Sequence, residues 1–276
     1  MAATTTRPLV RERNLVLASL LVLAAAAWAL LAWQSRSDDG DMAMGLTMGM
    51  AAPLFMAMWV AMMVAMMFPT AAPMILTFAR VHASKRERGQ PFVPTWVFVS
   101  SYLVVWTAFG VVAYGVAVGA ERLADQSMWL MEHAARFGGG VLVLAGLYQL
   151  SPLKRACLTK CRTPLDFILT SWRDGYGGSF RMGLEHGFYC LGCCWLLFVI
   201  LFPLGVMNVA AMAVITLLIY AEKSLPLGRQ AGVLAAVALV AYGMLVIFVP
   251  DALPTVMGDG SGGAGGMESM ASGIAR

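Results

Sequence analysis

The stretch at 53–79 reads PLFMAMWVAMMVAMMFPTAAPMILTFA and contains no Asp, Glu, Lys or Arg. A helix needs about 20 apolar residues to cross roughly 30 Å of hydrocarbon, where only internal hydrogen bonds can satisfy its backbone. The stretch exceeds this length, so it predicts a transmembrane helix. Its many methionines raise a second question, which is whether they only pack or also bind a ligand.

Composition extends the first conclusion to the whole chain. Of 276 residues, 60% are hydrophobic and 12% are charged, and the mean hydropathy is +0.75. Soluble domains carry about 25% charged residues, so a soluble domain is excluded and the lipid bilayer is the expected partner. The net charge of +4 does not indicate nucleic-acid binding, because the basic residues fall in short loops between apolar runs.

Seven apolar runs predict an all-α, polytopic transmembrane helix bundle. They are Leu15–Trp33, Pro53–Ala79, Trp96–Val118, a region ending at Leu150, Gly183–Pro203, Val206–Ala221 and Ala231–Val249. The fourth run is short, and extending it back to Met128 supplies the missing length. The first run could be a signal peptide, which would leave six spans, but its 19 residues are long for a signal sequence and favour a retained anchor.

The basic residues orient this bundle. Fifteen of the 19 Lys and Arg lie on one side of the predicted spans, and the four on the other side are Arg36, Arg122, Arg136 and Arg276. The positive-inside rule then makes the N-terminus cytoplasmic. We expect a multi-pass protein of the bacterial inner membrane, with a cytoplasmic segment at 1–14, one transmembrane domain at 15–250 and a flexible, glycine-rich external tail at 251–276.

A short helix is predicted between the fourth and fifth spans. The sequence TPLD at 163–166 has the spacing of a capping box and a proline at the first helical position. The apolar residues that follow share one helical face: Leu165, Ile168, Leu169 and Trp172. This pattern indicates a helix that lies in the cytoplasmic interface of the membrane.

The strongest candidate for chemistry is the stretch HGFYCLGCCW at 186–195. Its potential metal ligands are three or four residues apart: His186, Cys190, Cys193 and Cys194. A helix would bring the imidazole and two or three thiols onto one stripe, a ligand set that suits copper(I) or zinc. The alternative is that buried cysteines act as small hydrophobes and His186 as an interior hydrogen-bond donor.

A second pair of thiols, Cys157 and Cys161, precedes this stretch in a predicted cytoplasmic loop. The C-x3-C spacing places both sulfurs on one helical face, and the neighbouring Lys and Arg residues are expected to lower their pKa values. The two thiols could also form no site, since a stable disulfide is not expected in a reducing cytoplasm.

Methionines concentrate between Met42 and Met74, which contain 11 of the 21. Four lie in a predicted external loop, where a thioether has no core to fill: Met42, Met44, Met48 and Met50. Uncharged thioethers select soft ions, which indicates copper(I) capture. Four more are candidate ligands inside the second span, with packing as the alternative: Met62, Met63, Met66 and Met67.

Pro69 and Pro73 follow directly in the same span. Each lacks a backbone donor, so the carbonyls of Ala65 and Pro69 lose their helical partners. A broken helix in the membrane is tolerated where it lines a cavity, and a simple packing kink is the alternative. At the end of the sixth span, Glu222-Lys223 is interpreted as an interfacial ion pair, with a proton-coupling site as the alternative.

Four ordered blocks of the chain carry a family resemblance. They are Met58–Met74, Gly146–Pro164, Gly177–Trp195 and Glu222-Lys223. With these blocks the chain resembles the bacterial family of predicted metal-binding integral membrane proteins, a domain of unknown function. The resemblance implies a membrane protein that binds a metal, and it assigns no role to individual positions.

The leading hypothesis is a membrane protein that binds copper(I), with zinc possible, for transport or for delivery to a metallochaperone. External methionines would collect the ion, the second and fifth spans would hold it, and Cys157 and Cys161 would pass it on. A second hypothesis is an accessory or assembly subunit of a membrane metalloenzyme. A third is a membrane thiol oxidoreductase, because Cys190 and Cys193 form a C-x-x-C. An enzymatic role is not favoured.

Overall fold

The computed structural model describes residues 6–37 and 46–253 and confirms the all-α fold: these ranges contain helices and connecting turns, and no strand. The helices are α1 Thr6–Ser37, α2 Ala52–Glu87, α3 Thr95–Asp125, α4 Met128–Gln149, α5 Pro152–Arg162, α6 Pro164–Ser171, α7 Gly175–Val199, α8 Leu201–Leu204, α9 Val209–Ser224 and α10 Gly228–Phe248. A 3-10 turn at Pro250–Ala252 ends the described part.

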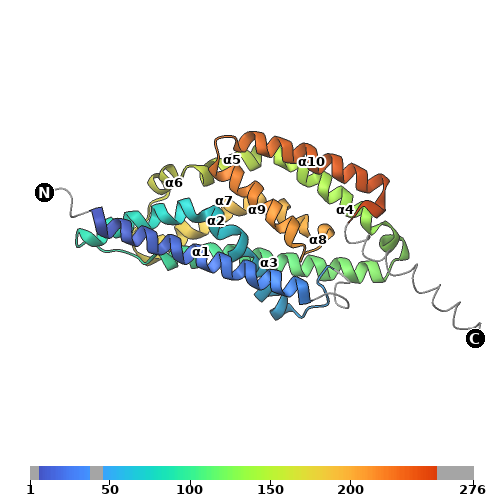
Figure 1. Ribbon diagram of the computed structural model, residues 1–276, viewed down its shortest axis with the longest axis horizontal. Coiled ribbons are helices and arrows are strands. Elements are labelled where there is room, and N and C mark those ends of the chain that lie inside the picture. Colours follow the sequence, from blue (N-terminus) through green and yellow to red (C-terminus); the bar gives the residue numbers. More distant parts are fainter. Residues whose placement is uncertain (1–5, 38–45, 254–276) are drawn as a thin grey trace, which may run out of the picture.

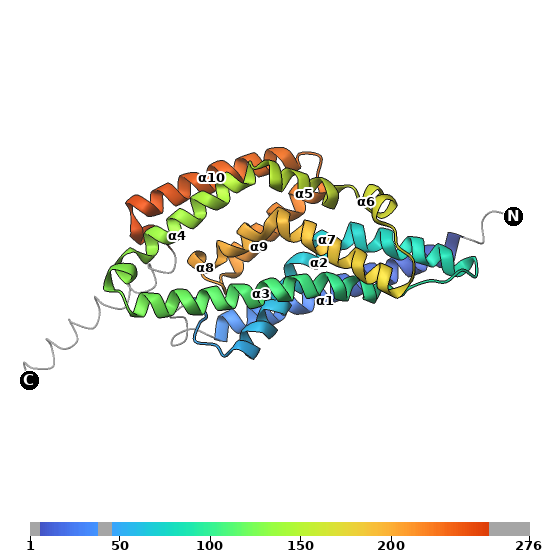
Figure 2. The ribbon, with the colours of Figure 1, turned by 180° about the vertical axis from the view of Figure 1, so that it is seen from behind.

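These helices pack in layers along an elongated bundle (Figures 1 and 2). α4 and α10 lie side by side in one outer layer, and α1, α2 and α3 lie on the opposite side. α7 and α9 lie between these layers, where α7 packs on α3 and α5, and α9 packs on α2 and α10. The inner helices are therefore covered from both sides, and chemistry on them is shielded from the surroundings.

Five helices in the described residues are long enough and apolar enough to cross a membrane: α1, α2, α3, the continuous α7–α8 segment and α10. Large apolar side chains are exposed on α1, α3 and α10, among them Val22, Val112, Val116 and Leu234. α4 begins at Met128, where the sequence predicted it, and α9 is only 16 residues long. The number of helices that span a membrane, these two included, stays a prediction.

The basic segments gather at one end of the bundle. Lys85 at the end of α2 forms an ion pair with Asp174 at 2.6 Å, just before α7, and Arg86 pairs with Glu12 of α1. The hydrogen bond from Lys85 lowers the pKa of Asp174 below its ordinary value. The start of α1, the end of α2 and the start of α7 therefore share this end, as the predicted topology requires.

α6 begins at Pro164, as predicted, but without the capping box. The hydroxyl of Thr163 donates to the carbonyl of Thr159 at 2.9 Å and makes no hydrogen bond to the start of α6. The capping-box interpretation was therefore wrong, because α5 ends directly before Thr163 and offers it a carbonyl. Leu165 and Leu169 are exposed, while Ile168 is buried, so the predicted apolar face is divided between the surface and the core.

α2 contains both prolines within a continuous helix. The carbonyl of Ala65, which Pro69 deprives of its helical donor, accepts a hydrogen bond of 3.0 Å from the indole nitrogen of Trp28 in α1. The sequence predicted that this carbonyl would lack a partner in α2. The structure shows that the freed acceptor joins α1 to α2.

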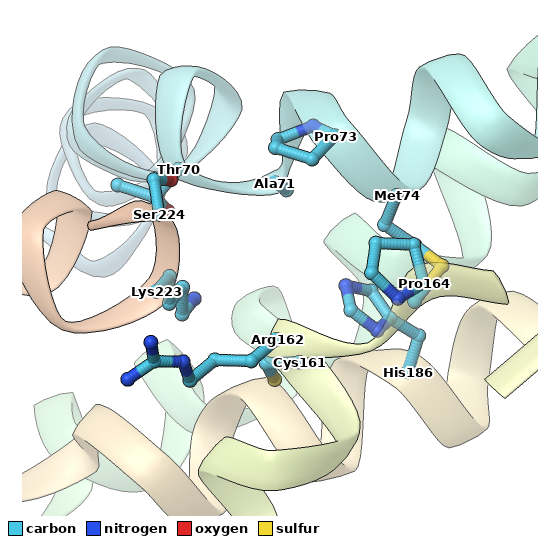
Figure 3. Close-up of a pocket in the computed structure, with 10 residues that line it drawn as sticks. All are labelled: Thr70, Ala71, Pro73, Met74, Cys161, Arg162, Pro164, His186, Lys223 and Ser224. Carbon is cyan, nitrogen blue, oxygen red and sulfur yellow. The ribbon is translucent and has the colours of Figure 1, made fainter. Parts of the chain in front are cut away.

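Ring contacts show that α2 is not straight. Trp59 contacts Phe109 with ring centroids 5.8 Å apart, and Phe78 contacts Phe98 at 4.8 Å. At 1.5 Å per residue, Trp59 and Phe78 would be about 28 Å apart in a straight α2. Their partners on α3 are only about 16 Å apart by the same measure. α2 must therefore bend between Trp59 and Phe78, and Figure 3 shows it changing direction near Thr70.

Glycines allow α4 and α10 to approach closely. A Cβ added at Gly139 would lie 2.8 Å from the carbonyl oxygen of Gly243, and one added at Gly243 would lie 2.7 Å from that of Gly139. Small residues are the usual means of close helix packing in membranes, where no hydrophobic force drives helices together. This contact fixes one wall of the bundle.

We expect Gly243→Val to lower the free energy of unfolding by about 1–3 kcal/mol, because the added carbon atoms force the two helices apart. Thermal unfolding of the detergent-solubilised chain would measure the loss. Gly140→Val is the matched control, since no atom lies within 4 Å of a Cβ there. Equal losses in the two variants would contradict the close-contact explanation.

Candidate metal centre

Four cysteines meet in the interior of the bundle, and we call them the sulfur cluster: Cys161, Cys190, Cys193 and Cys194. The last three lie on α7, and their exposed fractions are 0–2%. Cys161 comes from the last turn of α5, is 8% exposed and hydrogen-bonds to the sulfurs of Cys190 and Cys193. The three-to-four-residue spacing thus places the α7 sulfurs on the face that packs against α5.

Cys190 is the most strongly hydrogen-bonded member. Lys223 of α9 donates from Nζ to Cys190 Sγ at 3.0 Å, and the hydroxyl of Tyr102 on α3 lies 3.1 Å from the same sulfur. Both partners are buried. An ammonium group in contact with a buried sulfur favours the thiolate, which is the form that binds metals and acts as a nucleophile.

The two thiols of α5 are not activated by their basic neighbours, contrary to the prediction. Hydrogen bonds to Cys190 and Cys193 raise the pKa of Cys161 well above its ordinary value, and burial raises the pKa of Cys157. Part of the reason is that the Lys154 side chain turns into the bundle, where it pairs with Glu222 at 2.7 Å. Both thiols are therefore held in the protonated form.

Cys157 lies apart from the sulfur cluster. It is half-buried and packs against Gly192, where an added Cβ would lie 2.7 Å from Cys157 Sγ. All five cysteines are free thiols. The structure thus separates the two residues of the C-x3-C motif, with Cys161 joining the cluster and Cys157 remaining at its edge.

His186 lies one helical turn from Cys190 and is 2% exposed. It is enclosed by aromatic rings, with Tyr102 at 5.7 Å and Phe167 at 5.5 Å between ring centroids. Its Nδ1 atom has no hydrogen-bond partner among the described residues. Burial of a polar atom without a partner is costly, so this nitrogen is available to a ligand.

A pocket of about 190 Å³ adjoins His186 and Cys161. The bend of α2 contributes one wall with Thr70, Ala71, Pro73 and Met74, and the other lining residues are Cys161, Arg162, Pro164, His186, Lys223 and Ser224. Figure 3 shows Lys223 and the guanidinium of Arg162 on one side of the pocket and His186 with Met74 on the other. The bend of α2 at its two prolines therefore lines a cavity, and the simple packing kink is not a sufficient explanation.

The thiols are in a closed arrangement in this structure. Cys193 and Cys194 both donate to the carbonyl of Cys190, at 3.1 Å and 2.8 Å. Within residues 6–37 and 46–253, no group of three or more His, Cys, Asp or Glu side chains stands ready to hold a metal ion. A metal would have to displace these hydrogen bonds by rotation of the thiols.

The membrane methionines are core residues. Met62, Met63, Met66 and Met67 are at most 1% exposed. No contact in the described part of the chain brings their sulfurs to the sulfur cluster, and Met67 Sδ instead lies 3.8 Å from the hydroxyl of Thr70. Their packing role is thus observed, and their role as ligands stays a prediction.

The sequence predicted that the loop methionines have no core to fill, and this was wrong for the two that the structure describes. Met48 and Met50 are half-buried and pack against the core. They are also far from the sulfur cluster: the Met50 carbonyl contacts Tyr114, and Cys190 contacts Tyr102, positions about 18 Å apart along α3. Met42 and Met44 lie outside the described residues.

Glu222 and Lys223 do not pair with each other, so the interfacial ion-pair interpretation was wrong. Both are buried, and successive residues of a helix point in different directions. Glu222 pairs with Lys154, which also donates to Gln149, while Lys223 turns to Cys190. Lys223 thus contacts the sulfur cluster, and Glu222 does not pair with it.

Three residues that shape the site were not predicted from the sequence as part of it: Tyr102, Lys223 and Met74. Tyr102 carries a hydroxyl in the middle of an apolar span, which is a usable signal. Met74 was part of the methionine-rich run but was not selected as a ligand, and only the bend of α2 places it at the pocket. Lys223 lies 33 residues from Cys190, and no local pattern indicates their contact.

Comparison with known proteins gives one match. Residues 56–246 match the model of the family PpoB2, which is described as "Copper chaperone". The matched region includes all five cysteines, His186 and Lys223. No curated protein and no solved structure matches the chain.

Proposed function

This chain belongs to the PpoB2 family of copper chaperones, and we propose on that premise that it is a membrane-spanning protein that binds and delivers copper(I). The ion is held by thiolates of the sulfur cluster, with Cys190 as the first ligand and Cys161, Cys193 or Cys194 completing the coordination. Soft thiolates are the ligands that copper(I) prefers.

The observation that carries this proposal is the contact of Lys223 with Cys190 inside a group of four cysteines. Copper(I) bound by two thiolates has a net charge of −1, and an isolated charge of either sign is costly in a buried site. The Lys223 ammonium balances that charge. Zinc would need a third thiolate for the same balance, so the lysine supports copper(I) without excluding zinc.

Membrane insertion is part of the proposal. The five long apolar helices and their exposed valines and leucines support it, since such a surface is stable only in lipid or against a partner. The end of the bundle that carries Lys85, Arg86 and Arg162 is the cytoplasmic end by the positive-inside rule. Cys161 of the sulfur cluster directly precedes Arg162 in the basic helix α5, which supports delivery to a cytoplasmic acceptor or uptake from one.

The test is the metal content of the full chain, extracted from membranes in mild detergent under reducing conditions. We expect copper to copurify, or one copper(I) per chain to bind after anaerobic reconstitution. Mass spectrometry of the metal and titration with a coloured copper(I) chelator would measure it. The proposal fails if the folded chain neither retains copper nor binds it, and zinc alone would contradict the copper assignment.

A family of chaperones favours delivery over autonomous transport, so an assembly subunit of a membrane metalloenzyme is the second candidate. Its support is the small amount of structure outside the helices in the described ranges, which leaves little room for a separate catalytic unit. Copurification of a metalloenzyme with the chain would support this candidate. Copper flux into liposomes that contain the chain alone would support transport.

A further inference from the structure

The pocket beside the sulfur cluster carries a net positive charge, because the Cys190 sulfur balances Lys223 and no acidic lining residue balances Arg162. Arg162 and Lys223 line it, and none of the described residues that line it is Asp or Glu. The nearest candidate for a counter-charge, Glu222, is turned away and pairs with Lys154 at 2.7 Å. A free copper(I) cation that entered here would be repelled by Arg162 before it reached the Cys190 sulfur.

The pocket also has unused hydrogen-bonding capacity. Arg162 donates from one guanidinium nitrogen to the carbonyl of Leu225 at 2.9 Å, which leaves its other donors free for a carboxylate. His186 also lines the pocket, and its buried Nδ1 atom has no hydrogen-bond partner in the described part of the chain. Ser224 is exposed, so the pocket opens to the surface on its side.

Size limits the occupant. A cavity needs roughly 10–15 Å³ to hold one water molecule, so a pocket of about 190 Å³ holds several. This is room for one small organic thiol or for the thiol end of a longer one, and it is too little for a folded partner. A carboxylate on that thiol would meet Arg162 while its sulfur reaches the cysteines.

We infer that this pocket is an exchange site at which copper(I) arrives or leaves as an anionic complex with a small, carboxylate-bearing thiol. The inference rests on the proposed function and adds the chemical form of the cargo. Arg162 binds the carboxylate, and Lys223 attracts the anionic copper–thiolate group. Attraction by such charges raises association rates by about 10- to 1,000-fold.

The exchange balances without an oxidant or reductant. A complex of copper(I) with two donor thiolates carries one negative charge, and it meets the Cys190 thiolate and the Cys161 thiol. Two copper–sulfur bonds to the donor break, and two to Cys190 and Cys161 form. The proton of Cys161 passes to one departing thiolate, so one thiol and one thiolate leave. Copper stays in the +1 state throughout.

The test compares two copper donors by stopped-flow transfer to the full chain in detergent. One is the copper(I) complex of glutathione, which is an anionic thiolate, and the other is the copper(I) complex of acetonitrile, which is a cation. We expect Arg162→Gln to slow transfer from the glutathione complex by about tenfold or more, and to make loading from the acetonitrile complex no slower, because Arg162 repels that cation. Arg155→Gln is the matched control, because Arg155 is exposed on the same helix and does not line the pocket.

Further measurements separate charge from structure. Arg162→Lys should restore most of the transfer rate, and S-methylglutathione, which has the carboxylates but no thiol, should slow transfer to the wild-type chain. Equal rates for Arg162→Gln and Arg155→Gln with the glutathione complex would overturn the inference. If neither donor loads the wild-type chain, the proposed function itself fails, which is a distinguishable result.

Discussion

A Cys190→Ser chain is expected to bind copper(I) at least about 100-fold more weakly than the wild type, since even outer-shell changes at metal sites cost 10- to 100-fold. Serine fits the same space and can still accept a hydrogen bond from Lys223, so the fold should persist while the soft ligand is lost. Anaerobic competition with a copper(I) chelator would measure the affinity of the detergent-solubilised protein.

Cys157→Ser provides the matched control for this prediction. Cys157 is half-buried and takes no part in the hydrogen bonds among the other four sulfurs, so its loss should leave the affinity within about threefold, or less than 1 kcal/mol. Circular dichroism and gel filtration would show that both variants fold. Wild-type affinity in Cys190→Ser would place the metal elsewhere, and an equal loss in both variants would mean that the site extends to Cys157.

Helix positions were largely predictable because a helix that is to cross hydrocarbon needs a long apolar run, and such runs stand out in this sequence. α4 begins at Met128 and α3 begins one residue before Trp96, as hydropathy indicates. The ends of helices that continue beyond the apolar run were not predictable in this way. α1 begins at Thr6 instead of Leu15, because its first turns carry arginines that hydropathy excludes but a helix tolerates.

The site was predictable only where it follows helical spacing. His186, Cys190, Cys193 and Cys194 share one face because they lie within nine residues of a single helix. The remaining geometry depends on contacts between distant segments, such as Lys223 with Cys190, and on the bend of α2. Such pairings are set by how the helices pack, and a single sequence carries no local signal for them.

The same limit explains two of the interpretations that failed. Glu222 and Lys223 are adjacent and opposite in charge, so the sequence alone predicts that they pair. In the structure Glu222 pairs with Lys154 of α5, and Lys223 contacts Cys190 of α7. The basic residues around Cys157 and Cys161 suggested activated thiols, but the most buried of those lysines, Lys154, is neutralised by Glu222. In both cases a charge is directed by a partner that lies far away in the sequence.

Glu222→Gln is expected to destabilise the protein by about 3–5 kcal/mol, because it leaves the Lys154 ammonium buried without its counter-charge. The two side chains are 2–3% exposed and 2.7 Å apart, and a Cβ added at Gly232 would lie only 2.9 Å from Glu222 Oε1. The site therefore has little room for water to take the place of the carboxylate. Chemical unfolding in detergent would measure the change in free energy.

Two further variants test whether the cost of Glu222→Gln comes from leaving the Lys154 charge buried without a partner. The double change Lys154→Met/Glu222→Leu should cost far less than Glu222→Gln, because replacing a buried pair by apolar groups is often neutral. Asp166→Asn should cost less than about 1 kcal/mol, since its ion pair with Lys160 is exposed to solvent. If Glu222→Gln costs no more than Asp166→Asn, the Lys154 charge is not confined to the bundle interior. The assignment of Lys154 to Glu222 and of Lys223 to Cys190 would then be wrong, because Lys154 would be free to compete with Lys223 for the Cys190 sulfur.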